Sequence, residues 1–128
     1  MDLTLQILVG LATVMLLGLG TMSMFAPRRM VKNFAIEPVG TAGLNTIRSV
    51  IGGLFITSVA LLIFGLLTGQ TLGFVVVALL LGIVAFGRIV GIVADGFDKA
   101  VVPPLVVELI IIGVLMTAYV QLPTLLPI

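Results

Sequence analysis

The stretch GRIVGIVADG, residues 87–96, places Arg88 inside an otherwise continuous apolar segment. An arginine at the centre of a membrane-spanning helix costs about 2.5–3.5 kcal/mol, so it usually faces protein or trapped water and has a partner. Two other charged residues, Arg48 and Glu108, lie at similar depths in apolar segments of their own. The sequence therefore predicts helices that bring charged side chains together inside an apolar protein.

The composition defines the fold class. Of the 128 residues, 61% are hydrophobic and only 9% are charged, which is far outside the range of soluble domains. Apolar runs of about 20 residues recur without strand-like alternation, and helices satisfy their own backbone hydrogen bonds in lipid. We predict an all-α membrane protein, a four-transmembrane-helix bundle forming one domain over residues 1–128. The expected spans are about 3–25, 44–68, 71–94 and 101–122, with a basic loop at 26–43.

The basic residues predict the orientation in the membrane. Four spans place the first and third loops on one side, and all six Lys and Arg residues fall on that side. The positive-inside rule makes this side cytoplasmic and puts both termini on the non-cytoplasmic side. Arg28, Arg29 and Lys32 either face anionic headgroups from a short interfacial helix or belong to a solvated loop that only sets topology.

Small residues predict where helices approach closely. Ser49, Gly53 and Thr57 recur every four residues, which favours a face that packs against protein, and a GxxxG pattern occurs in the third span. The glycines expected at helix contacts are Gly52, Gly53, Gly87 and Gly91.

Depth along the helices predicts that Arg48, Arg88 and Glu108 converge in one layer, because each lies one to two turns from the same end of its span. Asp95 lies seven residues after Arg88 and so near the same helix face, farther out. Three interpretations remain open. The cluster is a structural salt-bridge network, an anion or lipid-headgroup site with surplus positive charge, or a proton- or ion-coupling site at Glu108.

The residue types of this chain give no support for an enzymatic activity. The chain has no His and no Cys, so the common nucleophile–base arrangements and the imidazole and thiolate metal ligands are missing. Asp95 and Asp98, beside Lys99, are typical of a helix end and a solvated turn. We therefore expect no catalytic residue, no metal site and no cofactor, and the few basic residues give no reason to expect nucleic acid.

Three motifs occur in order along the chain: IRSVIGG at residues 47–53, Gly87-Arg88 followed by Asp95-Gly96, and Glu108-Leu109. Together they resemble the small bacterial membrane proteins of domain of unknown function 4345. The resemblance covers roughly residues 44–113, and the first helix matches only in hydropathy. It implies a four-helix protein of the bacterial inner membrane with a signature carried here by Arg48, Arg88 and Glu108, and it implies no activity.

Two functions are compatible with these features. The first is a non-enzymatic accessory or assembly subunit, whose partners are the lipid bilayer and either other membrane subunits or further copies in a homo-oligomer. The alternative is a small transporter or binding protein that holds an anionic ligand or lipid headgroup at Arg48, Arg88 and Glu108.

Overall fold

The computed structural model of the chain describes residues 2–125, with side chains described for residues 2–121. Residue 1 and residues 126–128, the ends of the expected domain, lie outside this range. All regular secondary structure within it is helical, and four helical segments are long and apolar enough to cross a membrane. The predicted all-α class with four potential membrane spans is therefore confirmed.

Helix bounds differ from the expected spans by a few residues, except in the second span. The first, third and fourth spans are α1 (Leu3–Phe25), α5 (Leu72–Asp95) and α6 (Val102–Leu125), the last preceded by η2 (Lys99–Val101). The second span begins four residues earlier than expected, as a continuous helical segment made of α3 (Gly40–Thr46), η1 (Ile47–Ile51) and α4 (Gly52–Thr68). The basic loop contains a short helix, α2 (Pro27–Lys32).

Local sequence explains where these helices begin and end. The Asp2 carboxylate caps α1 by accepting a hydrogen bond of 2.7 Å from the backbone N–H of Thr4. Pro27 occupies the first position of α2, where a missing N–H costs nothing. Gly69 ends α4 with a φ of +76°, a left-handed conformation that glycine adopts without strain. The tight turn at Gly69 then starts α5 antiparallel to α4.

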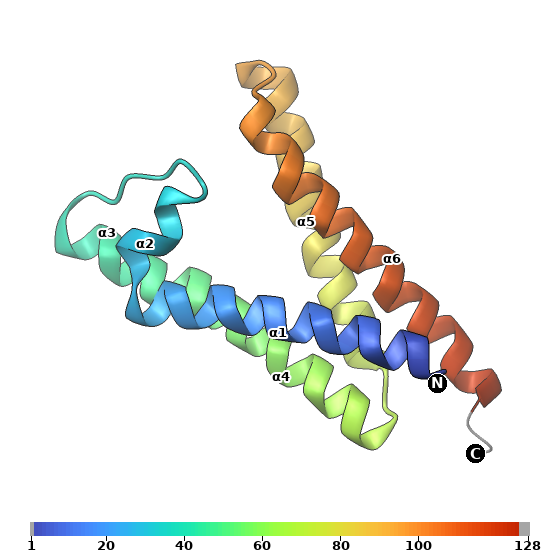
Figure 1. Cartoon of the computed structure of the whole chain (residues 1–128). Coiled ribbons are helices and arrows are strands. Elements are labelled where there is room, and N and C mark those ends of the chain that lie inside the picture. The colour runs from blue at the N-terminus through green and yellow to red at the C-terminus, as the bar shows by residue number, and fades with distance from the viewer. Residues whose placement is uncertain (1, 126–128) are drawn as a thin grey trace.

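The helices form two antiparallel pairs, which we call the first arm (α1 and α4) and the second arm (α5 and α6). Figure 1 shows that the arms meet near the N-terminus and the α4–α5 turn and diverge from there. The segment joining α2 to α3 lies at the far end of the first arm, and the α5–α6 turn lies at the far end of the second. The two loop-bearing ends of the molecule therefore lie apart from each other (Figure 1).

The main core lies where the arms meet. Phe74 of α5 is fully buried there, and a Cβ on Gly65 of α4 would stand 2.5 Å from its ring. Gly65 thus makes room for the ring between the two arms. The core contains residues from all four long helices: Val9, Ala12, Leu16, Val59, Leu62, Phe74, Val77, Ala78, Leu81, Ile111, Leu115 and Ala118.

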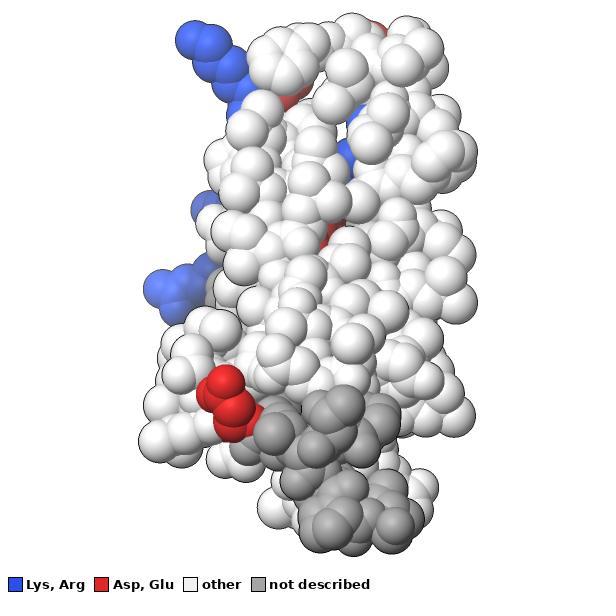
Figure 2. All heavy atoms as spheres, turned by 90° about the vertical axis from the view of Figure 1, so that its right-hand side faces the viewer, with Lys and Arg blue, Asp and Glu red and all other residues white. Residues whose placement is uncertain are grey.

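The outer surface is apolar as well. Large hydrophobic side chains such as Leu11, Leu79, Phe86 and Ile110 are more than half exposed. Figure 2 shows one such face, which is almost entirely uncharged. Soluble monomers rarely expose contiguous apolar surface of this extent, whereas membrane-spanning helices present it to lipid.

The second span presents Gly52 to α1, and not the predicted row of Ser49, Gly53 and Thr57. A Cβ on Gly52 would stand 2.7 Å from Cγ of Met24, so this glycine lies at a close contact between α1 and α4. No neighbouring atom lies within 4 Å of the same position on Gly53, and Ser49 and Thr57 are exposed. A π-helical turn, η1, lies directly before Gly52, and its i→i+5 bonding interrupts the regular four-residue spacing of the predicted span.

Candidate functional site

Arg88 and Glu108 form a two-pronged ion pair between the helices of the second arm. Nε of Arg88 donates to both carboxylate oxygens of Glu108, at 2.8 and 3.1 Å, and Nη2 donates to Oε2 at 3.0 Å. The side chains are 25% and 12% exposed, so both charges are largely removed from solvent. Bidentate geometry of this kind fixes the orientation of the guanidinium plane. Arg88 thus has the partner that its place in an apolar helix predicts.

Arg48 does not join this pair. Its guanidinium instead donates through Nη1 to the backbone carbonyl of Met24, close to the end of α1. The last carbonyls of a helix have no partner within the helix and lie at the negative end of its dipole. A cation there donates a hydrogen bond to an unpaired carbonyl and is attracted by the helix dipole. The expected meeting of three charges fails because η1 lies on the first arm and Arg88 on the second, and the arms diverge toward these ends (Figure 1).

A cleft of about 600 Å³ lies between the two arms, with the Arg88–Glu108 pair in its wall. This volume falls within the range of about 300–1,000 Å³ usual for small-molecule sites. Nearly all of the lining is apolar, from Leu16 and Leu19 of α1, through Phe55 of α4, to Val107 of α6. Asn33 and Ser58 add polar atoms, and the hydroxyl of Ser58 is already bonded to the carbonyl of Leu54.

The short helix α2 and the residues after it form part of the same cleft. Met30 and Val31 are buried against Ile47 of η1, which fixes α2 on the first arm. Asn33, Phe34 and Ile36 line the cleft beyond the end of α2. The three basic residues of α2, which are Arg28, Arg29 and Lys32, are all exposed on its opposite side. The basic segment is therefore helical, with an apolar side packed on the first arm and a basic side exposed.

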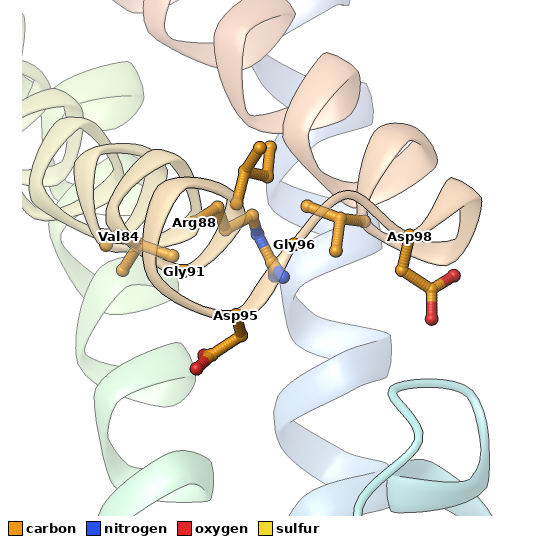
Figure 3. A pocket seen from close by; sticks show the side chains of 9 residues that line it. Val84, Arg88, Gly91, Asp95, Gly96 and Asp98 are labelled. Carbon is orange, nitrogen blue, oxygen red and sulfur yellow. The ribbon is translucent and has the colours of Figure 1, made fainter.

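A second hollow, of about 580 Å³, lies at the end of α5 and shares Arg88 and Val84 with the cleft. Figure 3 shows Arg88 extending between Asp95 and Asp98, whose carboxylates point outward on either side. The two aspartates therefore stand at the rim, and neither makes an ion pair with Arg88 within 4.0 Å in the described part of the chain. The bonds to Glu108 use Nε and Nη2 of Arg88, and among the described residues nothing accepts a hydrogen bond from Nη1.

Gly87 and Gly91 also line this hollow, where they were expected to be at a helix contact. A Cβ on either residue would meet no atom within 4 Å. In this structure they leave open space beside Arg88, because α6 approaches α5 on another face.

A family model described as "Domain of unknown function (DUF4345)" matches residues 4–119. The chain belongs to this family. The match includes α1, which from the motifs alone resembled the family only in hydropathy. No curated protein and no solved structure shows significant similarity to the chain.

Sequence reasoning missed three parts of this site. No feature of the sequence identifies the Met24 carbonyl as the partner of Arg48, because every residue carries a backbone carbonyl. Asn33 and Phe34 were not singled out as cleft-lining residues, although an amide and an aromatic ring directly after a basic segment were visible in the sequence. Asp98 was assigned to a solvated turn, and it does cap η2 by accepting from the N–H of Ala100, yet it also lies on the rim of the hollow.

Proposed function

We propose that this chain is a non-enzymatic membrane protein that binds an amphiphile between its two arms, with the apolar chain of the ligand in the cleft and an anionic group at Arg88. The observation that carries this proposal is the ion pair in the wall of an otherwise apolar cleft. Apolar lining with a few placed polar groups is the usual character of a ligand site. The proposal corresponds to the alternative function that the sequence suggested, with Arg48 removed from the site.

Charge at the open end of the cleft supports an anionic group on the ligand. Glu108 holds one edge of the Arg88 guanidinium and leaves Nη1, with its two N–H donors, for a ligand oxygen. The exposed basic residues of α2 add positive charge near the mouth of the cleft, because the opposite side of the same helix lines the cleft. Clustered Lys and Arg beside a membrane-spanning helix attract anionic headgroups.

The proposed orientation follows from the same charges. With the loop-bearing end on the cytoplasmic side of a bacterial inner membrane and both termini outside, the cleft opens at the level of the cytoplasmic headgroups. A lipid of that leaflet would then enter between the arms without crossing the bilayer core.

Photocrosslinking tests the proposal. The protein is reconstituted into phosphatidylglycerol vesicles that contain a phospholipid with a photoreactive acyl chain, and the crosslinked residues are mapped. We expect crosslinks concentrated on cleft residues such as Leu19, Phe55 and Val107. The double variant R88Q/E108Q, which keeps polar groups of similar shape without charge, should retain roughly tenfold less lipid through detergent purification, because a charge-assisted hydrogen bond is lost. K99Q, at an exposed base that lines neither the cleft nor the hollow, is the control.

Crosslinks spread evenly over outer residues such as Leu11 and Leu79 would overturn the proposal. If a second protein chain occupies the cleft and keeps the lipid out, the result would instead favour the accessory-subunit function that the sequence also suggested. That second candidate draws support from the open face at Gly87 and Gly91, where none of the described residues packs. It predicts a stoichiometric partner or a defined homo-oligomer after purification in mild detergent.

A further inference from the structure

The hollow beside Arg88 has a charge pattern that the cleft lacks. Going outward from the apolar cleft, the lining changes to the cationic Arg88 and then to Asp95 and Asp98 at the rim. The next charged residue, Lys99, is exposed and does not line the hollow. Within the cleft, Glu108 faces Nε and Nη2 of Arg88. A ligand that extends from the apolar part of the cleft along the Nη1 edge of Arg88 therefore meets the donors of Nη1 first and the carboxylates of Asp95 and Asp98 next.

The glycines give this hollow its room. Gly87, Gly91 and Gly96 line one wall, and the absence of side chains there leaves space next to the guanidinium. Gly96 has a φ of +99°, so the chain turns sharply out of α5 at this point and brings Asp98 to the opposite side of the opening. Figure 3 shows the two aspartates on either side of the extended Arg88 side chain.

From this pattern we infer that the hollow receives the polar group of a zwitterionic amphiphile, with the phosphate at Arg88 and the ammonium group at the rim beside Asp95 and Asp98. The inference rests on the proposed amphiphile-binding function and adds the class of headgroup. The phosphate accepts from Nη1 of Arg88, while Glu108 holds the guanidinium in place. The ammonium group donates hydrogen bonds toward the exposed carboxylates of Asp95 and Asp98. The same carboxylates would repel a headgroup that carries only negative charge.

Position in the membrane agrees with a headgroup at this site. The hollow is lined by the last three turns of α5 and by the turn into η2, so it reaches from the apolar span at Val84 to the polar loop at Asp98. The cleft and the hollow share Arg88 and Val84 in their walls, so a polar group at Arg88 in the hollow would lie next to an apolar chain between the arms.

Lipid retention by the full chain in detergent, measured by native mass spectrometry, tests the inference. The probes are phosphatidylethanolamine and phosphatidylglycerol with identical acyl chains, and glycerophosphoethanolamine, which has the same headgroup and no chains. We expect the wild-type protein to bind phosphatidylethanolamine roughly fivefold more tightly than phosphatidylglycerol, because exposed charge pairs contribute little individually. The variant D95N/D98N should lose this preference. Asn at position 98 keeps the acceptor that caps η2, and E37Q, an exposed acid outside the hollow, is the control.

The outcomes separate the two levels of the proposal. Equal binding of the two lipids, or an unchanged preference in D95N/D98N, overturns the zwitterionic headgroup and leaves the amphiphile function standing. Binding of neither lipid overturns the amphiphile function and this inference with it. If glycerophosphoethanolamine displaces phosphatidylethanolamine at comparable concentrations, the acyl chains contribute nothing and the site is one for a free zwitterion, which also overturns the amphiphile function.

Discussion

Single ion pairs stabilise a buried region only when their attraction exceeds the cost of desolvating both charges. For Arg88 and Glu108 this cost is high because both side chains lie mostly inside the protein. Breaking such a pair leaves one charge without a partner and typically costs more than replacing both residues by apolar ones. The contribution of the pair therefore has to be measured with single and double substitutions together.

We expect Glu108→Gln to lower the free energy of unfolding by about 3 kcal/mol, since it leaves the Arg88 guanidinium without a carboxylate. The double variant R88M/E108M should unfold within about 1 kcal/mol of the wild type, because methionines of similar volume need no partner. Unfolding in mixed detergent micelles gives these values. A double variant as unstable as the single one would mean that the polar pair itself holds the second arm together.

Arg48 has a separate role at the end of α1. Arg48→Met should cost about 1 kcal/mol, because the exposed guanidinium loses its bond to the Met24 carbonyl and its interaction with the helix dipole. In combination with R88M/E108M the loss should be additive within about 0.5 kcal/mol, as expected of sites without shared partners. R29M, an exposed arginine on α2, serves as control. Strong coupling would show that Arg48 belongs to the charged layer after all.

The charged residues show how far sequence reasoning reaches at this scale. Counting residues from the helix ends placed Arg88 and Glu108 at matching depths, and they do pair. The same count placed Arg48 with them, yet depth gives neither the direction of a side chain around its helix nor the distance between two helix pairs. A backbone carbonyl as partner also carries no signal in the residue types.

At the scale of elements, hydropathy predicts the long helices well because each is an apolar run bounded by Asp, Pro or Gly. The π-turn η1 is not predictable in this way, since IRSVI is compatible with an ordinary α-helix. The face of α4 that packs on α1 carries Gly52, whereas Gly53 lies away from that contact. Glycines in apolar helices thus indicate close contacts only when the face they lie on is known.

Glycine-to-alanine substitutions test this point on one helix. Gly65→Ala would bring a Cβ to 2.5 Å from the Phe74 ring at the junction of the arms, so the ring must shift. We expect it to lower the free energy of unfolding by about 1–3 kcal/mol, the usual cost of overpacking. Gly53→Ala, on the same helix with open space around the new atom, should be neutral or slightly stabilising because alanine favours helix. Equal effects of the two substitutions would contradict the close packing of Phe74 on α4.

For the whole molecule, the angle between the arms is the feature that the sequence does not reveal. Residues such as Leu62 in the core, Leu19 in the cleft and Leu11 on the outer surface are of one type. Hydropathy cannot separate these three environments when the solvent outside is lipid. The cleft and the hollow follow from which faces pack, and packing is decided by shape at positions such as Gly65 and Gly52.

Membrane orientation is the property of the whole molecule that the proposed site depends on most. The chain contains no cysteine, so single cysteines report their side of the membrane without interference. In intact bacterial cells an impermeant thiol reagent should label Gln70→Cys, in the α4–α5 turn. It should label Glu37→Cys and Phe97→Cys only after the membrane is permeabilised, because the six basic residues hold both of these loops on the cytoplasmic side. All three positions are exposed, so lack of labelling reflects the side of the membrane and not burial.

The labelling result also tests the position of the proposed site. If positions 37 and 97 are labelled from opposite sides of the membrane, α2 and the hollow beside Arg88 do not lie at the same leaflet, and the proposed arrangement is ruled out. Labelling of both from outside would move the proposed headgroup site to the opposite leaflet.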